Sequence, residues 1–159
     1  MAGKKILVAD DDPKILNLLL LCLAKEGYEV TGASDAYQAL QAAVEQMPDL
    51  LLLDINMPAG NGLSVQERLQ KVGSLCAKPV IYLTGNKSQS VQVAANRMGA
   101  FALLYKPFEI DHLRRTVRAA LHIPDGRRDD TEQSASTEWV IPAETFTERG
   151  FDERQNTDR

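Results

Sequence analysis

The sequence lacks the features that define several classes of protein. None of its apolar runs reaches the length of a membrane span, so we expect no transmembrane helix. Residues 1–5 are polar and lead directly into a strand-like run, without the longer apolar region of a secretion signal, which indicates a cytoplasmic protein. Cysteine is scarce: Cys22 and Cys76 have no metal-site spacing, and a reducing compartment disfavours a disulfide between them.

The sequence also lacks a large excess of charge of either sign. Its net charge is −4, with 25% charged and 44% hydrophobic residues, as in an ordinary globular protein. The slight acidity argues against a nucleic-acid-binding surface as the main activity. A length of 159 residues is enough for one domain with a real core and an additional segment.

Strand-like and helix-like segments alternate along residues 5–122. Three strand candidates are continuous apolar runs, which is typical of central strands in a parallel sheet covered on both faces. Five successive strand–helix units predict a doubly wound α/β fold, and the flavodoxin-like strand order 2-1-3-4-5 is the simplest for five strands. The expected strands are residues 5–9, 28–32, 50–53, 79–83 and 102–105, and the expected helices are residues 13–25, 35–46, 62–72, 88–98 and 109–121.

The composition changes after Pro124. Residues 125–159 are rich in charged residues, Thr and Gln, and contain few apolar groups. Such a segment cannot bury enough apolar surface to offset the entropy lost on ordering. We therefore predict one domain over residues 1–123 and a polar, disordered tail over residues 124–159. Within the tail, Trp139-Val140-Ile141 is either an incidental apolar stretch or a docking element.

Carboxylates gather where two apolar runs end. Asp10 and Asp11 follow the first run, and Asp54 follows Leu50–Leu53. In the predicted strand order, the carboxyl ends of the first and third strands are neighbours at the ligand-binding edge of the sheet. Carboxylates that close together need a cation or a proton to compensate their charge. This pattern predicts a Mg²⁺ site beside a carboxylate that can be phosphorylated, with a backbone carbonyl just past Asp54 as a further ligand.

Two later strands end in polar residues that suit the same site. The Thr84 hydroxyl follows the fourth strand and can donate a hydrogen bond to a phosphoryl oxygen. Lys106 follows the fifth strand and brings a compact positive charge, and Pro107 restricts the backbone after it. The third acid of the first cluster, Asp12, precedes Pro13 and is expected to cap a helix.

These residues, taken together, resemble the receiver domain of response regulators, the chemotaxis-regulator-like module of two-component signalling. The resemblance covers about residues 4–122, and its signature positions occur in the family's order. They are Asp10-Asp11, Asp54, Gly62 after the loop that begins Met57-Pro58, Thr84, and Lys106-Pro107-Phe108. The match implies the flavodoxin-like fold with five helices and a signalling module, not an enzyme.

The resemblance also implies roles for individual residues. Asp54 would accept the phosphoryl group from a sensor histidine kinase or a phosphotransfer protein. The Mg²⁺ ligands would be Asp10, Asp11, Asp54 and the Asn56 carbonyl. Thr84 and Lys106 would contact the phosphoryl group, with Gly62 and Pro107 in support and the Lys106–Pro107 peptide cis. Asn56 and Asn86 would border the path of the water that hydrolyses the acyl phosphate.

The family's output surface is expected over residues 88–121, where a downstream protein or a second phosphorylated copy would bind, without direct contact to nucleic acid or membrane. The family often has an aromatic residue three positions before its lysine, but this sequence has Leu103 there. Gly85 likewise stands where an alanine is expected after the threonine. The coupling of Thr84 to the output surface is therefore the feature that this sequence defines least.

A different reading of the acidic cluster remains open. Asp10-Asp11-Asp12 contains an Asp-x-Asp pattern, which resembles the nucleophile motif of haloacid-dehalogenase-like phosphatases. In that alternative the protein is a Mg²⁺-dependent phosphatase, with Asp10 as nucleophile and Asp12 as acid and base. Pro13 argues against it, because that family has small loop residues at this position.

Overall fold

The computed structural model describes residues 3–58 and 60–122, in which five strands alternate with five helices. The predicted tail, residues 124–159, lies outside the described residues. The strands are β1 (Lys5–Ala9), β2 (Glu29–Ala33), β3 (Leu50–Asp54), β4 (Val80–Thr84) and β5 (Ala102–Tyr105). The helices are α1 (Pro13–Lys25), α2 (Ala36–Gln46), α3 (Gly62–Leu69), α4 (Gln89–Arg97) and α5 (Ile110–His122).

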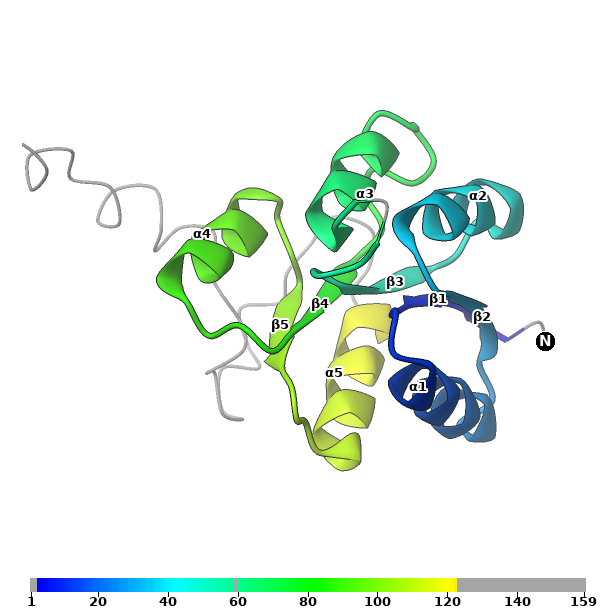
Figure 1. Cartoon of the computed structure of the whole chain (residues 1–159). Helices are drawn as coiled ribbons and strands as arrows, with labels where there is room; N and C mark the ends of the chain where they lie inside the picture. The colour runs from blue at the N-terminus through cyan, green and yellow to red at the C-terminus, as the bar shows by residue number, and fades with distance from the viewer. Residues whose placement is uncertain (1–2, 59, 123–159) are drawn as a thin grey trace, which may run out of the picture.

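All strand pairs are parallel, and the strand order is β2-β1-β3-β4-β5. Helices α2, α3 and α4 cover one face of the sheet, and α1 and α5 cover the other (Figure 1). This is the predicted flavodoxin-like fold. The largest error in the predicted bounds is at the end of α3, which stops at Leu69, before the predicted residue 72. The backbone there tightens into three-residue turns, with Val72 N donating to Leu69 O, so the helical ladder does not continue.

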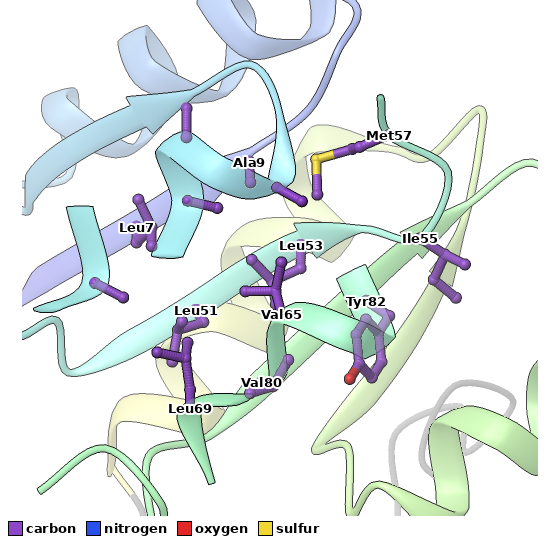
Figure 2. Packing of buried hydrophobic residues seen from close by; sticks show 14 of the residues in the cluster. Leu7, Ala9, Leu51, Leu53, Ile55, Met57, Val65, Leu69, Val80 and Tyr82 are labelled. Carbon is purple, nitrogen blue, oxygen red and sulfur yellow. The ribbon is translucent and has the colours of Figure 1, made fainter. Parts of the chain in front are cut away.

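Two apolar cores lie on opposite faces of the sheet. On β3, Leu51 and Leu53 pack toward α2 and α3 (Figure 2), whereas Leu50 and Leu52 pack toward α1 and α5. Successive strand side chains point to opposite faces, so a strand that is covered on both sides must be apolar at every position. This requirement explains the unbroken leucine run before Asp54.

Side-chain caps fix the N-terminal ends of α1 and α3, which lie at the carboxyl edge of the sheet. Asp12 accepts a hydrogen bond from Lys14 N at 2.9 Å and caps α1, as the sequence predicted. Asn61 caps α3 in the same way by accepting from Ser64 N at 2.8 Å. Asn61 was not among the predicted caps, although Asn is a favourable residue at this position.

A buried polar chain joins β4, α3 and the end of α4. Tyr82 is fully buried beneath α3 (Figure 2), and its hydroxyl donates to the side-chain oxygen of Gln66. Gln66 in turn donates to the carbonyl of Met98 at 2.9 Å, and Gln70 donates to the same carbonyl at 3.1 Å. Because Met98 ends α4, these bonds attach the C-terminal end of α4 to α3.

The structure also bears on the expectations about cysteines and about membrane-spanning helices. Both cysteines are free thiols: Cys22 is half-buried and Cys76 is exposed. Among the helices of residues 3–58 and 60–122, none is both long enough and apolar enough to cross a membrane.

Replacement of Tyr82 by Phe should destabilise the fold. The change leaves the buried oxygen of Gln66 without its donor, at a cost of about 1–3 kcal/mol. Urea denaturation should show this as a lower midpoint with an unchanged slope. The matched control is Tyr37→Phe, because Tyr37 is 69% exposed and should tolerate the change. Equal midpoints for the two variants would contradict the inferred role of the buried chain.

Candidate functional site

The candidate site lies at the carboxyl edge of the sheet, where four strands end. Asp10 follows β1, Asp54 ends β3, Thr84 ends β4 and Lys106 follows β5. These strands are consecutive neighbours in the sheet, so their ends meet at one edge. The structure therefore brings together residues that are separated by up to about a hundred positions in the sequence.

Three carboxylates at this edge form one acidic cluster. Asp10, Asp11 and Asp54 each offer an oxygen, and these oxygens all lie within 4.8 Å of one another. Asp10 and Asp54 are buried, whereas Asp11 is exposed, so the cluster opens to solvent on one side. Mg²⁺ prefers oxygen ligands and keeps several waters, and this donor set fits it.

Lys106 bridges the two buried carboxylates. Its Nζ lies 2.8 Å from Oδ2 of Asp10 and 3.1 Å from Oδ2 of Asp54. Burial alone would lower the pKa of the Lys106 ammonium, but the hydrogen bonds to the two carboxylates outweigh it and raise the pKa above its usual value. One positive charge thus faces two buried negative charges, and the site retains an excess of negative charge.

The pKa of Asp54 is raised by this environment. Burial, followed by the charge of Asp10, raises the pKa of Asp54 from 3.8 to about 6. Hydrogen bonds from Lys106 and from the backbone N–H of Asn56, which donates to Oδ1 at 3.1 Å, act in the opposite direction. Asp54 is therefore ionised at neutral pH, but in an environment that favours a proton or a cation beside it.

The Thr84 hydroxyl belongs to the same edge and to the loop that leads into α4. Its oxygen accepts a hydrogen bond from Asn86 N at 3.0 Å, and its proton remains able to donate. The Asn86 side-chain oxygen accepts from Ser88 N at 2.9 Å, so the loop orients this amide. The Asn56 side chain is exposed.

Gly62 is required by a close approach to the phosphoacceptor candidate. A Cβ at this position would lie only 2.5 Å from the backbone oxygen of Asp54. The Gly62 N–H also donates to Ile55 O at 3.1 Å, which draws the start of α3 onto the end of β3. The structure thus gives a steric reason for the glycine that the sequence analysis assigned to a supporting role.

The end of β5 combines one expected feature, a cis peptide, with an arrangement of aromatic residues that only the structure defines. The Lys106–Pro107 peptide is cis, as expected. Leu103 is buried and pairs in register with Tyr82. Tyr105 packs on the same core cluster as Leu103, whereas Phe101 packs on the opposite one.

Tyr105 links the site to α4, a contact that the sequence analysis did not identify. It pairs in register with Thr84, and its hydroxyl accepts a hydrogen bond from Gln92 of α4. Lys87, in the loop between Thr84 and α4, lies with Nζ 5.9 Å from the centre of the Tyr105 ring. The only sequence indication was an aromatic residue next to Lys106, which by itself is not informative.

Comparison with known proteins decides the family. The sequence profile described as "Response regulator receiver domain" matches residues 6–118. The chain belongs to the response regulator receiver family. Its fold is similar to that of chemotaxis protein CheY4 of Vibrio cholerae, with a TM-score of 0.72, 29% identity, and coverage of 76% of this chain and 100% of that one.

Curated relatives of this receiver include longer regulators. Transcriptional regulatory protein KdpE of Mycobacterium tuberculosis is 37% identical over 142 residues, which are 89% of this chain and 59% of the relative. Transcriptional regulatory protein YkoG of Bacillus subtilis, itself described as uncharacterized, is 39% identical over 125 residues, which are 79% of this chain and 54% of the relative. The chain thus spans a little over half the length of these relatives.

The alternative phosphatase reading does not fit the positions of the acids in this receiver. Asp12, its required acid and base, is exposed and caps α1 by accepting from Lys14 N. Asp10, its required nucleophile, is fully buried and paired with Lys106, and its Oδ1 accepts from Asp12 N at 2.9 Å.

Replacement of Asp54 by Asn should stabilise the metal-free receiver at high pH. The raised folded-state pKa means that the stabilising contribution of Asp54 is full below about pH 4 and is lost as pH rises through about 6. The variant should therefore gain about 1–2 kcal/mol over wild type at pH 8, after allowance for solvent screening, and nothing near pH 4. Urea denaturation in chelator at both pH values measures the difference.

The control for this experiment is Asp12→Asn, which removes an exposed charge and retains a helix-capping side chain. It should show no comparable gain at pH 8. A stability difference between wild type and Asp54→Asn that is the same at both pH values would rule out the electrostatic explanation.

Replacement of Gly62 by Ala should displace the start of α3 from Asp54. We expect a loss of about 1–3 kcal/mol in the free energy of unfolding, since a backbone carbonyl cannot move away cheaply. Gly73→Ala is the matched control, because no atom lies within 4 Å of the Cβ that it would add. If thermal unfolding shows equal effects for both substitutions, the steric explanation fails.

Proposed function

We propose that this receiver is the phosphoacceptor of a two-component phosphorelay and is phosphorylated on Asp54 by a histidine kinase. One observation carries the proposal: a buried Asp54 carboxylate faces two further acids and a lysine at the carboxyl edge of the sheet. In the transfer, a carboxylate oxygen of Asp54 forms a bond to phosphorus. The phosphorus–nitrogen bond of the donor phosphohistidine breaks, and its electron pair returns to the imidazole.

Charge compensation is the main task of the surrounding residues. A phosphoryl group carries roughly −1.5 to −2 charges near neutral pH, and the site is already acidic. Mg²⁺ held by Asp10, Asp11, Asp54 and the Asn56 carbonyl would neutralise charge on the transferred group. Lys106 would exchange part of its pairing with Asp54 for a bond to a phosphoryl oxygen.

Thr84 would communicate the phosphorylated state to the rest of the domain. A phosphoryl oxygen on Asp54 gives the Thr84 hydroxyl a charged acceptor that is absent otherwise, which biases the conformational equilibrium of the loop after β4. The contacts of Tyr105 with Lys87 and Gln92 support a route from this loop to α4. We assign the output to residues 88–121, which would bind a downstream protein or a second phosphorylated copy.

Asn56 and Asn86 would set the lifetime of the acyl phosphate. Amide side chains can orient a water molecule but cannot accept its proton. A moderate rate of self-dephosphorylation is the expected result, so the domain is a signalling module whose chemistry acts only on itself.

The longer relatives indicate the kind of protein in which such a receiver domain occurs. KdpE and YkoG are described as transcriptional regulatory proteins, and another relative is the DNA-binding response regulator MtrA of Mycolicibacterium smegmatis. We assign protein contacts, not nucleic-acid contacts, to the receiver domain itself, and we expect it to act in the cytoplasm.

Phosphorylation should map to Asp54. Incubation with acetyl phosphate and Mg²⁺ should give a mass gain of one phosphoryl group, and peptide mapping after reductive trapping should place it on Asp54. The gain should be lost in Asp54→Asn and in chelator, and strongly reduced in Asp11→Asn. The control, Asp12→Asn, should be labelled like wild type.

One outcome would reverse the assignment. Labelling on Asp10 that persists in Asp54→Asn would favour the phosphatase alternative over the phosphorelay. Labelling of Asp54 that is unaffected by chelator would instead remove Mg²⁺ from the proposal.

A further inference from the structure

The side of the domain away from α1 and α5 carries a groove between two helices. Helices α3 and α4 lie beside each other on this face of the sheet (Figure 1), and the groove between them has a volume of about 660 Å³. Leu63, Val93 and Met98 give it an apolar lining, and Glu67 and Arg97 add a charge of each sign. Its volume lies within the range of about 300–1,000 Å³ that is typical of binding clefts.

We propose that Trp139-Val140-Ile141 of the same chain docks in this groove. The triplet is the densest apolar stretch of residues 125–159, and it contains the only tryptophan of the chain. An aromatic ring followed by two branched aliphatic side chains suits an apolar lining. This inference goes beyond the proposed function and does not depend on phosphorylation of Asp54.

The length of the connecting chain allows this contact. The described structure ends at His122 of α5, and residues 123–138 separate it from the triplet. A connection of this length spans about 50 Å when extended and roughly 20 Å as a flexible coil, compared with a domain radius of gyration of about 13–14 Å. A route around the edge strand β5 also crosses α4, which lies on the β5 side of α3 (Figure 1).

Tethering makes even a weak site effective. A segment joined through a short flexible linker experiences an effective concentration in about the millimolar range. A contact with a dissociation constant in that range would be too weak to detect between separate molecules, but it would be populated within one chain.

The large apolar side chains exposed elsewhere on the domain form a less favourable docking surface for an aromatic ring than the α3–α4 groove does. Leu18 and Leu21 lie on the outward-facing surface of α1, Tyr37 and Val44 lie on that of α2, and Met47 caps the C-terminal end of α2. The α3–α4 groove is open to solvent, but a side chain docked in it contacts residues of two helices, whereas a single helix surface contacts it from one side. We therefore assign the triplet to the α3–α4 groove.

Fluorescence of Trp139 tests the proposal in the full chain without Mg²⁺ or a phosphoryl donor. Wild type should show blue-shifted emission and a several-fold lower acrylamide quenching constant than a free peptide of residues 133–145. Val93→Gln in the groove and Val140→Asp in the tail should each return both values to those of the peptide. The tail substitution leaves the packed domain unchanged, and thermal melts check that the groove variant is folded.

Two matched controls complete the design. Leu21→Gln alters an apolar residue on α1, 64% exposed, and should leave the emission as in wild type. Asp54→Asn should also retain the blue shift, so that docking and the phosphorelay proposal can fail separately.

Three results would overturn the docking proposal. The first is emission and quenching in the wild-type chain that equal those of the peptide. The second is a blue shift that Val93→Gln leaves unchanged. The third is a blue shift that disappears on dilution, which would assign the contact to a second copy.

Discussion

The bridge from Lys106 to two buried carboxylates is the interaction on which the site depends. With Nζ at 2.8 Å from Asp10 and 3.1 Å from Asp54, it allows two acids to be buried at neighbouring strand ends. Burial, followed by the charge of Asp10, outweighs the pairing with Lys106, and the pKa of Asp54 therefore rises to about 6. The excess of negative charge would favour a bound cation, and the acid whose pKa is raised is the residue that we propose as phosphoacceptor.

The two ends of α4 are held by different hydrogen bonds. At its C-terminal end, Gln66 and Gln70 of α3 both donate to the carbonyl of Met98. Nearer its N-terminal end, the attachment runs through Gln92 to Tyr105, whose backbone pairs with that of Thr84. A change at Thr84 would therefore act on the N-terminal half of α4 while α3 holds the other end, with the α3–α4 groove between them.

The sequence-based predictions were accurate for features that depend on neighbouring residues in the chain and inaccurate for features that depend on distant ones. The leucine run of β3 and the Asp12 cap were predictable, because burial pattern and capping chemistry are local. The early end of α3 and the Tyr82–Gln66 bond were not, because each depends on neighbours that are distant in sequence. Tyr105 is the clearest case: the family pattern drew attention to Leu103, whereas the structure places the aromatic link to α4 two residues later.

The sequence by itself determined the fold and the strand ends at which the candidate site residues lie. Apolar periodicity dictates which segments are buried strands, and the topology of parallel sheets then brings their carboxyl ends together. Only the tertiary structure decided how the charges are shared, why Gly62 must lack a side chain, and which aromatic residue contacts α4. Those features depend on separations of a few ångströms between segments far apart in the chain, and no local pattern encodes such distances.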